Sequence, residues 1–213
     1  MSKLVAAVFV AAALGLSGCA SSYYATMAKF GWEKRDILVS RVKEARAEQA
    51  EAQKTFASAL DEFRALVNIN GGELETQYDR MNASYERAKT QAQDVRNRIK
   101  AVNDVSARLF GEWEKELALY ESADLRRRSA DQLARTRVDY EKLYGAMSRA
   151  AAKMDPVLSL YQDQVLFLKH NLNARAISSL DVERTQIEAR VAALIEEMNT
   201  AIKEADTFIA SMK

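Results

Sequence analysis

The sequence predicts an all-α protein, an elongated antiparallel coiled-coil-like bundle of about four long helices. The 213 residues include only one proline and seven glycines, too few for the turns that a β-sandwich or an α/β fold of this length requires. Apolar residues recur at alternating spacings of three and four along four stretches, which is the coiled-coil period. Hydrophobic residues make up 48% of the chain and charged residues 29%. This balance excludes a disordered chain and an all-apolar membrane bundle.

Residues 1–18 predict a signal peptide. Lys3 supplies a positive charge, and the uncharged apolar run Leu4–Leu16 follows it. This run is shorter than the about 20 residues of a transmembrane helix, but it has the length of a signal-peptide core. The sequence Leu-Ser-Gly-Cys at residues 16–19 then resembles the lipobox of bacterial lipoproteins. The resemblance implies cleavage before Cys19 and lipidation of its sulfur.

The alternative is an ordinary signal peptide with a chance cysteine, but Cys19 is the only cysteine of the chain. Ala20 rather than aspartate follows it, and in Gram-negative lipoproteins this pattern implies export to the outer membrane. We therefore expect an outer-membrane protein that is held by acyl chains such as palmitate and faces the periplasm. Several acyl chains anchor a protein far more firmly than one does.

The mature chain predicts a lipidated tether with the start of the first helix at residues 19–36 and a single elongated bundle domain at residues 37–213. The first heptad pattern runs from Leu38 to Leu66, and only Gln49 in it is polar. Residues 68–72, Asn-Ile-Asn-Gly-Gly, interrupt it with side chains that tolerate a positive φ.

The second pattern runs from Leu74 to Trp113 and contains one polar member, Ser106. A weaker break follows at residues 121–124, where Ser122 or Asp124 could cap the next helix.

The third pattern runs from Leu133 to Met154 and resumes one position out of phase at Leu158. The change of phase coincides with Pro156, which removes one hydrogen bond from a helix interior. We expect the helix either to be kinked there or to be broken, with Pro156 in the first turn of a new helix.

The fourth pattern runs from Leu180 to Met212, with Arg184 on the same stripe. A break near residues 174–179 is expected before it, because Ser178 and Ser179 can cap a helix. Four helices with short turns predict an up-down-up-down bundle, in which a helix of about 45 residues is about 65–70 Å long. The end beside the lipid should be partly three-helical, since the fourth helix is too short to reach it.

Three segments of the mature chain are similar to the uncharacterised bacterial envelope family domain of unknown function 2959. They are residues 23–31, residues 34–39 and above all residues 165–177, with the sequence VLFLKHNLNARAI. The resemblance covers essentially the whole mature chain. It implies no activity and no site residues.

Composition argues against several chemistries. One cysteine and one histidine leave no partners for a disulfide, a zinc site or a histidine-based triad. We therefore expect no enzyme, no cofactor and no metal. The chain has 31 basic and 30 acidic residues, and loss of Lys3 with the signal peptide balances them. No bulk field then attracts nucleic acid.

Two local groups are candidate sites. Lys169, His170, Asn171 and Asn173 form a candidate partner-binding patch for a glycan or a protein, beside the apolar residues 165–168, which are wider than one stripe needs. The alternative is that these side chains cap and pack a helix end.

Arg126, Arg127 and Arg128 form a candidate membrane-proximal basic run. Positive charge in a first helical turn opposes the helix dipole, so we expect compensation. The glutamates at 112–121 across the turn could supply it, and so could lipid phosphates. Aromatic residues near the anchor, such as Trp32, could lie at headgroup level or pack at the bundle end.

The function that the sequence predicts is a membrane-anchored periplasmic scaffold of the cell envelope, structural or binding, without enzyme activity. The alternative is a periplasmic adaptor or chaperone-like clamp that holds a protein client. An envelope protein or peptidoglycan is a candidate partner, and the oligomeric state is left open. Lys213 resembles the last residue of the major outer-membrane lipoprotein, which is joined to peptidoglycan, but the expected topology directs it toward the membrane.

Overall fold

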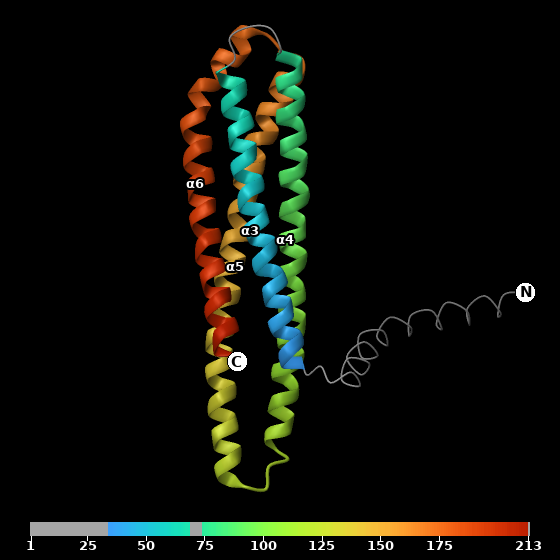
Figure 1. Cartoon of the computed structure of the whole chain (residues 1–213), viewed down its shortest axis with the longest axis vertical. Coiled ribbons are helices and arrows are strands. Elements are labelled where there is room, and N and C mark those ends of the chain that lie inside the picture. The colour runs from blue at the N-terminus through green and yellow to red at the C-terminus, as the bar shows by residue number, and fades with distance from the viewer. Residues whose placement is uncertain (1–33, 69–73, 213) are drawn as a thin grey trace, which may run out of the picture.

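The computed structural model describes residues 34–68 and 74–212, and these form the all-α bundle that the sequence predicts. The helices are α3 Lys34–Val67, α4 Leu74–Leu117, α5 Ala123–His170 and α6 Ala174–Ser211. They run antiparallel, side by side, in one rod (Figure 1). Each packs against two neighbours, so that α3, α4, α5 and α6 form a closed ring around one core. The predicted signal peptide, Cys19, the aromatic residues near it and Lys213 lie outside the described residues.

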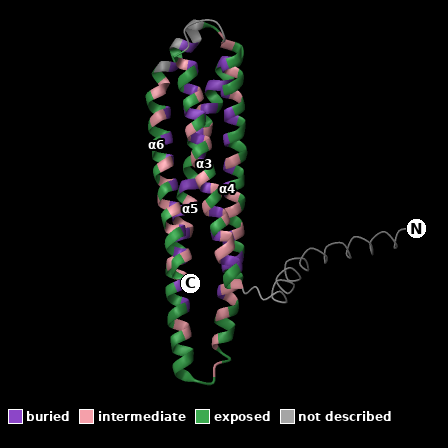
Figure 2. Cartoon of the chain, in the orientation of Figure 1, coloured by how far each residue is buried: buried purple, intermediate pink, exposed green. Residues whose placement is uncertain are grey.

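The heptad positions predicted from the sequence form this core. Every member of the first pattern is buried, and so is every apolar member of the fourth. In Figure 2 the buried residues recur along the helices above the C-terminus, whereas the hairpin below it is mostly exposed. Burial of apolar surface is the main source of stability for such a bundle. The largest fully buried side chains come from all four helices: Tyr161, Phe56, Phe63, Phe208, Leu38, Leu66, Met81, Leu143, Met147, Met154, Leu168 and Ile187.

Small residues fill much of the middle of the core. Alanines on all four helices are buried there, and they allow the helix backbones to approach closely. The buried alanines are Ala45, Ala52, Ala59, Ala88, Ala92, Ala146, Ala150, Ala151, Ala201 and Ala205.

Gln49 is the one polar interruption of the α3 stripe, as the sequence predicts. Its side chain is fully buried, and neither its amide nitrogen nor its amide oxygen has a partner among the described residues. Burying an amide without hydrogen bonds costs free energy. A polar residue at a single core position can nevertheless fix the register of packed helices, and we interpret Gln49 in this way.

We predict that Gln49→Leu raises the free energy of unfolding by about 1–3 kcal/mol, because it removes the desolvation cost of the amide. Urea unfolding followed by circular dichroism measures it. The matched control is Gln77→Leu, because the Gln77 amide donates to Glu62 Oε2 at 3.2 Å. A loss of stability in Gln49→Leu would contradict an uncompensated desolvation cost of the buried amide.

Around Pro156 the structure excludes the second predicted alternative, a break, and the predicted change of phase is wrong. α5 is continuous from Ala123 to His170, and the buried stripe passes from Met154 to Val157 and Tyr161 without a change of phase. Leu158, predicted as the core position, is only partly buried. Pro156 and Ala152, whose carbonyl loses its helical donor, are both exposed. Water can therefore solvate that carbonyl, and the helix continues through the proline.

The start of the fourth helix also differs from the prediction. α6 begins at Ala174, so Ser178 and Ser179 lie inside the helix instead of capping it. The break is at residues 171–173. There the Asn173 carbonyl accepts the first helical bond of α6 from the Ile177 amide at 3.1 Å. The predicted cap at Ser122 is confirmed, since its Oγ accepts from the Leu125 amide at 3.3 Å.

The two ends of the rod are unequal. Lys34 at the start of α3 pairs with Glu112, and the Arg35 guanidinium donates to the Met212 carbonyl, so α3 and α6 end at the same level. Among the described residues only α4 and α5 continue beyond it, as a two-helix hairpin (Figure 1). We call residues 114–131 the hairpin tip. The third helix predicted for this end would consist of residues before Lys34, outside the described residues.

Candidate functional site

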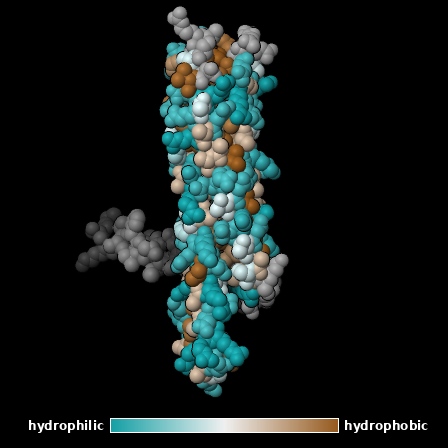
Figure 3. All heavy atoms as spheres, turned by 90° about the vertical axis from the view of Figure 1, so that its left-hand side faces the viewer, coloured by the Kyte–Doolittle hydropathy of each residue, from teal (hydrophilic) through white to brown (hydrophobic). Residues whose placement is uncertain are grey.

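Exposed apolar side chains concentrate at the two ends of the rod. Six large ones are exposed among the described residues: Leu119, Leu125, Val138, Leu166, Phe167 and Val182. The first two belong to the hairpin tip, and the last three lie near the α5–α6 turn at the opposite end. The face in Figure 3 is mostly hydrophilic, with hydrophobic atoms in small groups along its length, the upper end included. These ends are therefore the candidate sites.

The α5–α6 end contains the predicted partner-binding patch. Leu166 and Phe167 are 51% and 42% exposed, whereas Val165 and Leu168 beside them are buried. The run of four apolar residues is thus half core and half surface. Val182, 81% exposed, lies on α6 about 12 Å from its start at 1.5 Å per residue. We call Leu166, Phe167 and Val182 the apolar end.

Two members of the predicted patch hold the turn together. The Asn171 side chain donates from Nδ2 to the Phe167 carbonyl at 3.0 Å, and its amide donates to the Leu168 carbonyl at 3.2 Å. The Asn173 amide donates to the Asn171 carbonyl at 2.8 Å. Asn171 is thus the C-cap of α5.

The other two, Lys169 and His170, are exposed in the last turn of α5. Positive charge is favourable at a helix C-terminus. The C-cap accounts for an asparagine at position 171. Binding of a partner by the four residues of the predicted patch stays a prediction.

We predict that Asn171→Ala lowers the free energy of unfolding by about 0.5–1.5 kcal/mol, because it removes a hydrogen bond to a terminal carbonyl. Lys169→Ala is the control, with an expected change of only a few tenths of a kcal/mol. Urea unfolding of both variants is the measurement. Equal stability of Asn171→Ala and the wild type would remove the capping role.

The hairpin tip contains the predicted basic run, and its compensation differs from the prediction. The Asp124 carboxylate pairs with Arg127 at 2.7 Å and with Arg128 at 2.9 Å. The Arg126 guanidinium donates to the Tyr120 carbonyl at 2.8 Å. Asp124, rather than a glutamate of α4, compensates the charge of these arginines because residues three and four apart on a helix are neighbours. Arg127 and Arg128 are nevertheless about three-quarters exposed.

Two of the glutamates across the turn have other partners. Glu112 pairs with Lys34. Glu114 pairs with Arg137 at 2.7 Å, and the hydrogen bond from Arg137 lowers the pKa of the Glu114 carboxyl. These pairs tie α4 to α3 and α5 rather than to the basic run.

Leu119 and Leu125 are the tip residues that the sequence did not single out. They are 78% and 53% exposed and flank the α4–α5 turn. A signal was present, since both are apolar residues off the heptad stripes beside a predicted break. Arg126, Arg127 and Arg128 follow Leu125 directly and are exposed as well, so the tip presents apolar and cationic side chains together.

A small cavity lies where the four-helix core gives way to the hairpin. It is lined by Arg35, Leu109, Trp113, Gln132, Thr136, Ser211 and Met212. The Trp113 indole, which lines the cavity, donates from Nε1 to Ser129 Oγ at 2.8 Å. Just inside it, Tyr140 contacts Phe110 and Phe208 edge to face, with ring centroids 5.5 and 6.4 Å apart. Burial raises the pKa of the Tyr140 phenol.

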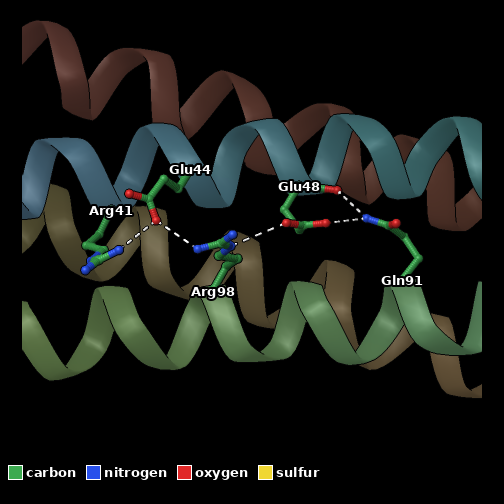
Figure 4. A network of polar contacts seen from close by, with 5 residues as sticks. All are labelled: Arg41, Glu44, Glu48, Gln91 and Arg98. Carbon is green, nitrogen blue, oxygen red and sulfur yellow. Dashed lines mark hydrogen bonds and ion pairs between the residues drawn. The ribbon is translucent and has the colours of Figure 1, made fainter.

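A polar network fixes α3 against α4 midway along the rod (Figure 4). Glu44 accepts from Arg41 at 2.8 Å and from Arg98 at 2.9 Å. Arg98 also pairs with Glu48 at 3.4 Å, and Gln91 donates to Glu48 Oε1 at 2.5 Å. The contacts join three residues of α3 to two residues of α4, so the network helps to hold these two helices in register.

Neither a metal cluster nor a membrane span is found in the described part of the chain. No group of three or more histidine, cysteine, aspartate or glutamate side chains is placed there to hold a metal ion. No helix of residues 34–68 and 74–212 combines the length and apolar character needed to cross a membrane.

Comparison with known protein families gives a match over most of the chain. The model of the family described as protein of unknown function (DUF2959) matches residues 23–212. No curated protein matches the chain.

Proposed function

The chain belongs to the DUF2959 family of proteins of unknown function, and we propose that it is a membrane-anchored, non-enzymatic scaffold of a bacterial cell envelope. The anchor in this proposal is Cys19, lipidated after cleavage of residues 1–18 and held in the outer membrane. The rod then extends into the periplasm. In this proposal the two ends of the rod bind its partners, because most of the large exposed apolar side chains among the described residues lie there.

The observation that best supports this proposal is that exposed apolar residues lie at opposite ends of the rod. Leu119 and Leu125 lie at the hairpin tip, and the apolar end lies at the other end of α5 and on the first turns of α6. α5 has 48 residues, which corresponds to about 72 Å at 1.5 Å per residue. A protein with two separated contact surfaces is suited to hold a partner at a fixed distance from a membrane.

The hairpin tip is the end that this proposal places at the membrane. α3 begins at Lys34, level with Glu112, so the chain that leads back to Cys19 departs from the same end as the tip. Exposed arginines suit lipid phosphates, and exposed leucines suit the apolar layer beneath them.

The opposite end favours a protein partner over peptidoglycan. Leu166, Phe167 and Val182 offer apolar surface, and such surface is typical of protein interfaces. The same observation supports the alternative of an adaptor for a protein client.

We predict that a photo-crosslinking residue at position 167 yields a discrete protein adduct in intact cells. Lys100, exposed midway along α4, is the matched control position, where no adduct is expected. Leu166→Ser should reduce the adduct at 167 several-fold without changing the melting temperature, because Leu166 is on the surface.

Mass spectrometry of the membrane fraction tests the anchor in the same cells. A lipid-modified Cys19 is expected, and an unmodified mature Cys19 would overturn the anchoring. Equal crosslinking at positions 167 and 100 would overturn the role of the apolar end.

A further inference from the structure

The hairpin tip, residues 114–131, carries charges of both signs in nearly equal number. It contains five acidic and four basic residues, which are Glu114, Glu116, Glu121, Asp124 and Asp131 against Lys115, Arg126, Arg127 and Arg128. Glu114 is paired with Arg137, which lies outside the tip, so the remaining charges of the tip balance. An anionic surface would attract half of these side chains and repel the other half. The tip therefore has no net charge that favours an anionic partner.

The arginines of the tip keep free hydrogen-bond donors. Asp124 pairs through one carboxylate oxygen with Arg127 Nη2 at 2.7 Å and through the other with Arg128 Nε at 2.9 Å. A guanidinium group has five N–H donors, so the pairs with Asp124 leave donors on both arginines for a further acceptor. Both side chains are about three-quarters exposed. They can therefore donate to a phosphate group while Asp124 orients them.

Two carboxylates of the tip are free to accept. Glu116 and Glu121 are exposed, and no ion pair or hydrogen bond joins their side chains to another of the described residues. Glu121 directly precedes the cap residue Ser122 and lies between Leu119 and Leu125 in the sequence. A carboxylate accepts most strongly from a charged N–H donor. The tip therefore offers acceptors for an ammonium group beside donors for a phosphate.

Leu119 and Leu125 give the same surface an apolar part. Both are more than half exposed, at the end of the hairpin that extends beyond α3 and α6 (Figure 1). Glu112 is level with the start of α3, and from there to Ser122 the hairpin rises about 15 Å at 1.5 Å per residue. Apolar side chains among charged ones are typical of a surface that lies between water and acyl chains.

The anchor of the proposed function places a membrane within reach of the tip. Residues 20–33 separate Cys19 from Lys34 at the start of α3. A chain of this length spans at most about 50 Å, which exceeds the about 15 Å by which the tip extends past Lys34. The membrane that holds Cys19 is therefore the surface that the tip can meet.

We propose that the hairpin tip binds a zwitterionic phospholipid surface whose headgroups carry a phosphate and a primary ammonium group. Arg127 and Arg128 donate to the phosphates. Glu116 and Glu121 accept from the ammonium groups, and the two exposed leucines lie at the edge of the acyl layer. This inference rests on the proposed placement of the tip at the membrane and names the lipid that the tip recognises. A quaternary ammonium group has no N–H donor for the carboxylates, so phosphatidylethanolamine is favoured over phosphatidylcholine.

The reactivity of a thiol at the tip tests this inference. The lipidated mature protein with Leu119→Cys is reconstituted in vesicles and treated with a water-soluble maleimide, to which the lipid-modified Cys19 does not react. In mixed vesicles of phosphatidylethanolamine and phosphatidylcholine, the thiol should react at least about five-fold more slowly than in phosphatidylcholine alone, because docking removes it from water. Leu166→Cys, at the opposite end, should react equally fast in both kinds of vesicle.

Two pairs of substitutions test the two halves of the recognition separately. Arg127→Gln with Arg128→Gln removes the donors for the phosphate. Glu116→Gln with Glu121→Gln removes the charged acceptors for the ammonium group. In mixed vesicles, each pair should return the rate at position 119 to the rate in phosphatidylcholine alone.

Lys54→Gln with Lys100→Gln is the matched control, since both lysines are exposed midway along the rod. This variant should keep the slow reaction at position 119. All the substituted charges are exposed, so the melting temperature of each variant should stay at the wild-type value, which circular dichroism measures.

Three results would overturn the inference. They are equal rates at position 119 in both kinds of vesicle, slow reaction that survives both pairs of charge substitutions, and slow reaction that requires phosphatidylglycerol instead of phosphatidylethanolamine. The last result would identify an anionic surface, bound by the arginines alone. An unmodified Cys19 would contradict the proposed anchoring, whereas slow reaction at position 119 that depends on phosphatidylethanolamine would still support this inference.

Discussion

The structure depends on one constraint, that each helix has a single continuous apolar stripe and no way to bury it alone. The stripes extend through helices of 34 to 48 residues, and only a ring of four antiparallel helices covers them all. Buried alanines draw the helices close in the middle, and larger side chains such as Phe56 and Tyr161 fill the layers around them. A rod rather than a globule follows, because the stripes are long and narrow.

The periodicity of the sequence was sufficient to predict this core, and the errors lie where two local solutions compete. Directly after Pro156 stand two apolar residues, Val157 and Leu158, and only packing decides that Val157 is the buried one. At the start of α6, the serines are good caps by type, but the Asn171 cap ends α5 and lets the next helix begin earlier. Cap preferences are local and weak, whereas the helix boundary is set by the whole turn.

The candidate sites were less predictable, because exposure depends on where neighbouring helices end. The run at 165–168 could be found, since four consecutive apolar residues exceed one stripe. Leu119 and Leu125 could be noticed as apolar residues off the heptad stripes, but their exposure followed only from the ends of α3 and α6 near Glu112, which leave the hairpin tip without further helices among the described residues. The partner of the basic run was missed because side-chain direction within the first turn, rather than charge on the facing helix, decides which carboxylate Arg127 contacts. These features support the proposed scaffold, a rod that binds partners at its two ends and keeps these ends apart by the length of its middle part.

The orientation of the rod on the membrane tests this account most directly. Full-length protein with Leu125→Cys or Phe167→Cys, labelled with a fluorophore and reconstituted in vesicles with nitroxide-labelled headgroups, reports how near each end lies to the lipid. The account predicts strong quenching at position 125 and almost none at position 167, which lies a rod's length away. Equal quenching at both positions, or stronger quenching at 167, would contradict an upright rod anchored at its hairpin tip.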